Sequence, residues 1–201
     1  FTTSTLQQAG VRQLGMTTDR VMRTAQQLYE GVDFGEGPVG LITYMRTDSV
    51  SLGADAISEI RGVIRKLYGA AALPDTPRVY KTKAKNAQEA HEAIRPTDFF
   101  RHPKEMRKFL DDDMAKIYDL IWKRAIASQM QGAEMERTTA EIEAVNGSKT
   151  AGLRAVGTVV RFDGFLAAYT DHREEEEEDE DSARLPEIRS GETQDKRSIE
   201  A

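Results

Sequence analysis

The spacing of apolar residues predicts that the first two thirds of the chain are mainly helical. Threonines and a serine within residues 2–5 offer N-caps before an apolar stripe over residues 6–14. Further stripes at three- and four-residue steps cover residues 18–29, 52–67 and 106–130. We therefore expect two short helices, one long amphipathic helix, and one or two helices ending near Met130.

A short extended segment is expected between the second and third of these helices. Residues 31–40 hold four Gly and one Pro, which is typical of a loop. Residues 41–45 are mostly β-branched, aromatic or apolar and predict a strand. Since side chains two apart on a strand share a face, Tyr44 and Arg46 should point the same way.

The character of the chain changes near residue 131. Residues 138–145 alternate between apolar and polar, Asn146-Gly147 is a hairpin signal, and residues 151–162 read as the returning strand. Residues 165–169 and 185–188 are expected to add strands.

We therefore predict an α+β fold with two domains. The first, residues 1–130, is a mainly helical domain with a winged-helix-like (CAP-like) core, because a tight Gly15 turn joins the first two helices and a strand follows. The second, residues 131–201, is built of antiparallel strands with an acidic loop at 173–183. One interpretation of the whole is a noncatalytic winged-helix DNA-binding module with an appended β domain.

Charge is divided unevenly between these domains. The net charge is −6, yet residues 1–130 carry 19 Lys and Arg against 16 Asp and Glu, and residues 131–201 carry 9 against 18. Eight acidic residues form the unbroken run 174–181. Because local charge decides phosphate binding more than the total does, the first domain stays eligible to bind nucleic acid.

Tyr44 and Arg46 form the first candidate site. A guanidinium binds phosphate oxygens in bidentate fashion, and a phenol beside it is a potential nucleophile. The alternative is a buried strand tyrosine beside a solvated arginine.

His91 and Arg95 form the second candidate site. Asn86 can cap a short helix that ends before Pro96, and residues four apart lie on one helix face. Both side chains could donate hydrogen bonds to a phosphate, although a lone helical histidine is more often structural. His102 and His172 show no ligand spacing to His91, so a metal site is not indicated.

Composition excludes several classes of protein. Cys is absent, which excludes disulfides and thiolate metal sites and fits a cytoplasmic location. No run approaches the roughly 20 apolar residues of a membrane span, and no signal segment opens the chain. Because residue 1 is Phe1 rather than Met, we expect a fragment of a longer chain.

Several segments together resemble the type IA DNA topoisomerases, among them the bacterial type I enzymes. Each segment alone is modest support, whereas five in the family's order are highly specific. They are residues 1–8 (FTTSTLQQ), 25–31 (AQQLYEG), 40–49 (GLITYMRTDS), 88–96 (QEAHEAIRP) and 161–165 (RFDGF).

The resemblance implies a role for each candidate residue. Tyr44 lies where the family places the nucleophile that forms a 5′-phosphotyrosine with one DNA strand. Arg46 and His91 lie where the family stabilises the scissile phosphate. Further family-like, DNA-binding positions are Thr3, Ser4, Thr47, Asp48 and Arg95.

The resemblance also implies what lies outside these 201 residues. The family's Mg²⁺ is held by an acidic domain of the toprim type, so Mg²⁺ is expected for the intact enzyme and no metal or cofactor in this fragment. Residues 131–201 resemble part of the family's arch. Expected partners are single-stranded DNA, negatively supercoiled duplex DNA and the remaining domains of the same polypeptide, with no membrane and a nucleoid-associated place in the cytoplasm.

Overall fold

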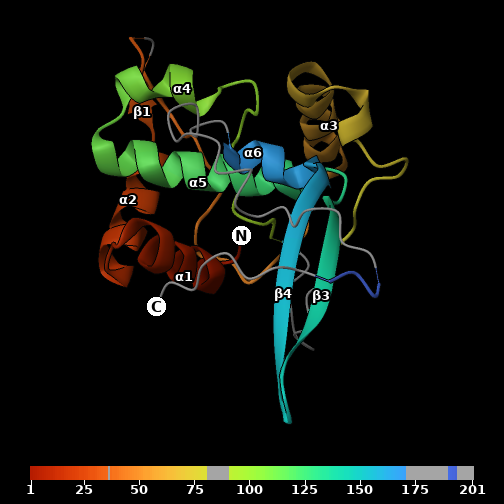
Figure 1. Cartoon of the computed structure of the whole chain (residues 1–201). Coiled ribbons are helices and arrows are strands. Elements are labelled where there is room, and N and C mark those ends of the chain that lie inside the picture. The colour runs from red at the N-terminus through yellow and green to blue at the C-terminus, as the bar shows by residue number, and fades with distance from the viewer. Residues whose placement is uncertain (36, 81–90, 171–189, 194–201) are drawn as a thin grey trace. The chain divides into compact units, whose positions relative to one another are not determined.

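The computed structural model describes residues 1–35, 37–80, 91–170 and 190–193, and confirms the α+β class (Figure 1). The chain forms two compact units, of which the first comprises Phe1–Gly132 with Gly164–Asp171. The second comprises Ala133–Asp163 with His172–Ala201. The acidic loop expected at 173–183 and the strand expected at 185–188 lie outside the described residues.

The first unit is mainly helical. Its α-helices are α1 (Thr3–Leu14), α2 (Thr18–Glu30), α3 (Ala54–Tyr68), α4 (Pro103–Met106), α5 (Asp112–Ser128) and α6 (Ala167–Thr170). Its 3₁₀ helices are η1 (Ala70–Ala72), η2 (Arg107–Phe109) and η3 (Gly164–Leu166). The short strands β1 (Val32–Asp33) and β2 (Pro38–Val39) pair antiparallel in the loop after α2.

The ends of the first two helices follow local sequence signals. Thr2 caps α1 in a capping box with Thr5, and Gly15 ends the helix in the left-handed conformation at φ 65°. The Thr17 side chain caps α2. The predicted helix pair is thus confirmed, while its assignment to a winged helix stays a prediction.

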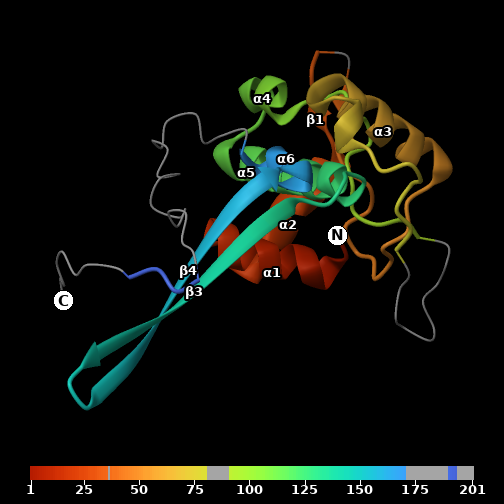
Figure 2. The same cartoon turned by 45° about the vertical axis from the view of Figure 1, so that its right-hand side comes forward.

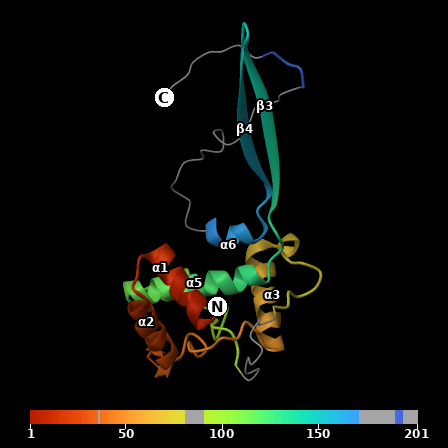
Figure 3. The same ribbon diagram turned by 90° about the horizontal axis from the view of Figure 1, so that it is seen from below.

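Helix α5 is the centre of the first unit. It contacts α1, α2, α3 and α4, and it runs between the α1–α2 pair and α3 in Figure 3. Its Trp122 and Tyr118 are fully buried, and each satisfies its polar atom on the segment just before α4. Trp122 Nε1 donates to the Phe99 carbonyl at 3.0 Å, and the Tyr118 hydroxyl donates to the Arg101 carbonyl at 2.8 Å.

The predicted strand over residues 41–45 is wrong as regular structure. Only an isolated bridge, Ile42 to Pro96, forms there. Thr43 N–H donates to the Arg95 carbonyl and Thr97 N–H donates to the Leu41 carbonyl, so the pairing with residues 95–97 is limited to this one bridge. Leu41 N–H donates instead to the Leu28 carbonyl near the end of α2. Exposed and buried side chains nonetheless alternate over residues 44–49, although the chain bends at Thr43, Met45 and Arg46.

Two further local predictions are wrong. Residues 91–95 are not helical: the Ala93 and Ile94 N–H groups donate to carbonyls of residues 51 and 1, which holds this segment against other chain segments. Residues 86–90 of the expected helix lie outside the described ranges. Residues 165–169 form η3 and α6 instead of a strand, because Gly164 turns the chain at φ 51° close to the Gly132 carbonyl.

The second unit contains a long antiparallel ribbon, as the hairpin signal predicts. Strands β3 (Glu134–Asn146) and β4 (Lys149–Phe162) pair throughout and coil around each other in Figure 2. Their turn is Gly147 and Ser148, one residue later than expected, with Gly147 at φ 62°. Most ribbon side chains are exposed, so the ribbon has little core of its own.

Candidate functional site at the start of helix α1

A cavity of about 410 Å³ lies where the start of α1 meets two later segments of the first unit. Its lining residues come from residues 2–4, 46–48 and 91. They are Thr2, Thr3, Ser4, Arg46, Thr47, Asp48 and His91.

Hydrogen bonds join the first turn of α1 to the segment that follows Tyr44. Thr3 N–H donates to the Thr47 carbonyl at 2.8 Å, and Thr47 N–H donates to the Thr3 hydroxyl oxygen at 2.9 Å. The Thr3 hydroxyl donates to the Met45 carbonyl at 2.8 Å. Thr3 and the buried Thr47 therefore form the frame that carries Arg46 and Asp48 on its outer side.

The electrostatics of the cavity favour an anion. The first turn of α1 contains no acidic residue, so the positive end of the helix dipole is not neutralised there. Arg46 and His91 both have exposed side chains on the lining, and both can donate to phosphate oxygens. Asp48 is the one opposing charge among the described lining residues, so phosphate binding alone does not explain its place.

Tyr44 is an exposed side chain on a fixed backbone. The residue is 43% exposed, while the preceding Thr43 donates its hydroxyl to the Ala93 carbonyl at 2.8 Å and the following Met45 is buried. Tyr29, from the last turn of α2, packs edge-to-face against the Tyr44 ring with centroids 5.3 Å apart. Tyr44 is not among the cavity's lining residues, but it lies two residues before Arg46 in the alternating segment.

The guanidinium of Arg95 is engaged in hydrogen bonds within the protein. Its guanidinium donates to Glu92 Oε2 at 2.6 and 3.0 Å and to the Pro96 carbonyl at 2.8 Å, and its side chain is 16% exposed. Glu92 Oε1 accepts from Gly53 N–H at 2.7 Å. Gly53 is the N-cap residue of α3 and has no side chain of its own to cap the helix. The pair therefore ties the His91 segment to α3.

The structure thus brings six of the eight predicted site residues to one cavity and leaves Tyr44 and Arg95 off its lining. Sequence reasoning assigned no role at the site to Tyr29 or Glu92. Tyr29 belonged to the apolar stripe of its helix, and its exposure beside Tyr44 carried no signal in the sequence. Glu92 lies three residues before Arg95, a spacing that suits an ion pair on a helix, but the segment is not helical.

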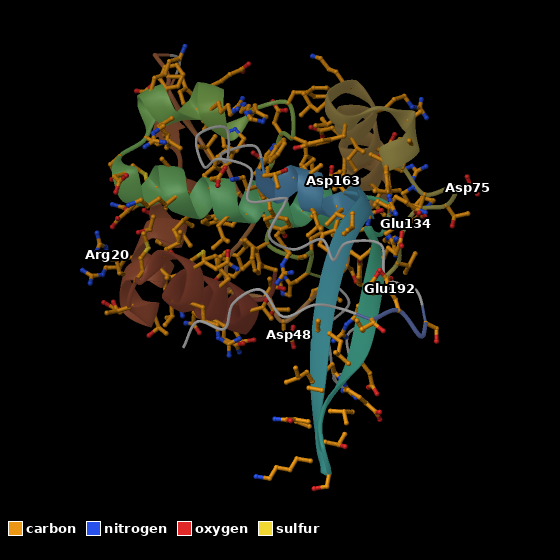
Figure 4. All side chains as sticks on the ribbon, in the orientation of Figure 1. Arg20, Asp48, Asp75, Glu134, Asp163 and Glu192 are labelled. Atoms are coloured by element: carbon orange, nitrogen blue, oxygen red, sulfur yellow. The ribbon has the colours of Figure 1, made fainter. Side chains whose placement is uncertain are left out.

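An ion pair elsewhere on the unit has a structural place. Arg20, labelled in Figure 4 far from Asp48, forms a bidentate ion pair with Asp113 that joins α2 to α5. Within the described ranges, no group of three or more His, Asp or Glu side chains could hold a metal ion. None of the described helices has the length and apolar character that crossing a membrane requires.

Comparisons with known proteins agree on one family. A family model described as DNA topoisomerase matches residues 1–201. The chain is 50% identical over 195 residues to DNA topoisomerase 1 of Xylella fastidiosa (strain 9a5c), covering 96% of this chain and 24% of that protein. It is 48% identical over 186 residues to DNA topoisomerase 1 of Rickettsia conorii, covering 92% of this chain and 24% of that protein.

A solved structure is similar as well. Full-length topoisomerase I from Thermotoga maritima matches with a TM-score of 0.72 and 37% identity, over 86% of this chain and 27% of that one. The chain therefore spans about a quarter of the length of the relatives that it matches. On these matches, the chain belongs to the DNA topoisomerase family.

Proposed function

We propose that this chain carries the nucleophile of a type IA DNA topoisomerase, with Tyr44 attacking a phosphodiester of single-stranded DNA. The Tyr44 oxygen forms a bond to phosphorus as the bond to the 3′ oxygen breaks. The phenol gives up its proton and the departing 3′ oxygen takes one up. The products are a 5′-phosphotyrosine and a free 3′-hydroxyl. The observation that carries this proposal is the cavity that joins Arg46, His91 and the start of α1 beside the Tyr44 segment.

The residues of that cavity suit the transition state of this displacement. Negative charge grows on the nonbridging phosphate oxygens, and cations that are already in place offset it without reorganising. Arg46 and His91 supply donors from two segments, and the dipole of α1 adds a third contribution. Ser4 and Asp48 contact the DNA next to the bound phosphate. Thr3 and Thr47 hold the backbone that carries Arg46 and Asp48 in place.

Resealing reverses the same displacement. The phosphotyrosine keeps the energy of the broken phosphodiester, so the 3′-hydroxyl can attack it without ATP. Passage of another strand between the two events relaxes negatively supercoiled duplex DNA. This cycle is the function proposed for the intact, longer protein, an isomerase of the cytoplasm and nucleoid.

The proposed cycle also needs groups outside this chain. As the family resemblance implies, Mg²⁺ would be held by a toprim-type domain of the longer protein, where it would stabilise phosphate charge. The steps derived above involve only the residues of this chain.

The ribbon of the second unit is proposed as part of an arch. Exposed apolar side chains run along both strands, and a two-stranded ribbon is marginal without a partner that buries them. They are Met135, Val145, Leu153, Val156 and Val160. Further strands of the longer protein would cover them.

Relaxation of a negatively supercoiled plasmid tests the proposal. The full-length protein should relax it with Mg²⁺ present, Tyr44→Phe should abolish relaxation, and the 201-residue chain alone should have little or none. Relaxation by the Tyr44→Phe enzyme at the unmodified rate would overturn the assignment of the nucleophile. A noncatalytic DNA-binding module would instead give only a salt-sensitive complex.

A further inference from the structure

A second cavity of the first unit has no part in the reaction proposed above. It measures about 490 Å³, within the range of roughly 300–1,000 Å³ typical of small-molecule sites. Helix α5 and the η3–α6 turn contribute to its walls, together with the segment before residue 81. The residues that bear on its chemistry are Arg78, Tyr80, Arg124, Phe165 and Tyr169.

Its aromatic walls are held by polar contacts. The Tyr80 hydroxyl donates to the Ser128 carbonyl at 2.8 Å, which restrains the side chain of a residue that is 46% exposed. Burial raises the pKa of the Tyr169 phenol, with the nearby Arg124 opposing that shift, so Tyr169 stays neutral at physiological pH. Arg124 also lies over the Phe1 ring at 5.0 Å. These rings are thus positioned before any ligand arrives.

The charge of the lining is positive. Arg78 Nε donates to the Met130 carbonyl at 2.9 Å, and the backbone N–H of Arg78 donates to Gln129 Oε1 at 3.1 Å. No acidic side chain is among the described residues that line this cavity. Aromatic rings interleaved with arginines are typical of sites where the bases of a single strand stack and its phosphates are neutralised.

The second cavity adjoins the first. Thr2, the N-cap of α1, lines both of them, and Thr5, one turn along, lines the second. A strand whose phosphate lies at Arg46 and His91 can therefore continue across the start of α1 into the second cavity without leaving the unit.

We infer that this second cavity is a subsite for a nucleotide of the same single DNA strand whose phosphate is bound beside Tyr44. The inference rests on the proposed function for the position of that strand. The base stacks on Tyr80 and its neighbouring rings, and Arg78 and Arg124 neutralise the flanking phosphates. The subsite adds affinity and fixes the register of the strand, and it takes no part in bond making.

Photocrosslinking of the full-length Tyr44→Phe protein tests the subsite with its lining intact. Single-stranded oligonucleotides carry one 4-thiothymidine at successive positions, and peptide mapping locates each crosslink. At one or two adjacent positions the crosslink should fall on the peptides that contain Tyr80 or Tyr169. Crosslinks that never fall on these peptides, at any position, would overturn the inference.

Binding measurements test the chemistry of the same subsite. The double variant Arg78→Ala/Arg124→Ala loses both phosphate contacts. The slope of log affinity against log salt should therefore become less steep by about 1.4, which is roughly 0.7 for each of the two phosphates. Tyr80→Ala should raise Kd for the oligonucleotide about fivefold or more. Arg65→Ala, which removes an arginine from the last turn of α3, is the matched control and should change neither. Arg78, Arg124 and Tyr80 variants that match this control would overturn the inference.

A covalent-adduct assay separates this inference from the proposed function. With a wild-type Tyr44, the Arg78→Ala/Arg124→Ala enzyme should still form an adduct at Tyr44 at saturating DNA. An adduct at Tyr44 without crosslinks in the second cavity refutes the subsite alone. Absence of any Tyr44 adduct in the wild-type enzyme refutes the proposed function, on which the subsite depends.

Discussion

Replacing Gly40 with alanine should destabilise the first unit and disturb Tyr44. A methyl group built at Gly40 lies 2.7 Å from the Tyr29 carbonyl oxygen, closer than real side chains approach. That oxygen is backbone at the end of α2, and the neighbouring bonds from Leu41 N–H to the Leu28 carbonyl at 2.8 Å and from the Thr97 hydroxyl to the Gly40 carbonyl at 2.7 Å hold both sides. Since neither side can yield freely, we expect a loss of about 1–3 kcal/mol in the free energy of unfolding.

Urea denaturation followed by tryptophan fluorescence measures this loss. Trp122 is the single tryptophan and is 1% exposed, so its emission reports unfolding of the first unit. The midpoint should fall while the slope with denaturant stays constant. The control is Gly62→Ala within α3, where a built methyl group meets no atom within 4 Å. This control should gain about 0.5–1 kcal/mol from helix propensity.

The two glycines therefore differ in the predicted sign of the change. A Gly40→Ala protein as stable as the unmodified chain would refute the close approach between residue 40 and the end of α2. The same substitution should also slow DNA cleavage by the full-length enzyme, because it displaces the backbone that sets the Tyr29–Tyr44 contact.

Three further substitutions test other contacts. Glu92→Gln weakens the charge-assisted bonds to Arg95 and should cost about 1–2 kcal/mol in urea denaturation, whereas an unchanged midpoint would show that the pair carries no stability. Tyr29→Ala should lower the single-turnover cleavage rate at saturating DNA with little change in Kd. Tyr29→Phe keeps the ring against Tyr44 and should cleave at the unmodified rate. A Tyr29→Phe variant as slow as Tyr29→Ala would contradict ring packing as the cause. Burial raises the pKa of Tyr118 above 10.0, so stability should be complete below pH 10 and fall as pH rises further, and Tyr118→Phe should reduce that fall in denaturation series from pH 8 to 11.

The helices could be predicted because their signals are local. Thr2 and Gly15 delimit α1 by hydrogen bonds and a left-handed φ that involve only near neighbours in sequence. The ribbon followed equally from alternation and a turn dipeptide. The segment at residues 41–45 was misassigned because its backbone bonds are divided between Leu28 and residues 95–97, and its pairing with the latter is a single bridge, which local sequence signals do not report.

The candidate site was predictable in its residues but not in its assembly. Alternation was enough to place Tyr44 and Arg46 on one face of their segment, while the exposure of that face is seen only in the structure. That His91 shares a cavity with Arg46 depends on tertiary bonds from Ala93 and Ile94, and the local helix signals around Asn86 and Pro96 favoured a different conformation. The restraint of Arg95 by Glu92 likewise follows from folding, since each side chain alone suits a solvated surface.

The central claim is that Tyr44 is the nucleophile of a strand-cleaving reaction, and mapping of the covalent adduct tests it most directly. The full-length protein is denatured while it cleaves a labelled single-stranded oligonucleotide, then digested and analysed by mass spectrometry. We predict a nucleotide phosphate linked through its 5′ oxygen to Tyr44, and no adduct in the Tyr44→Phe protein. An adduct on any other residue, or one that persists in Tyr44→Phe, would contradict the claim.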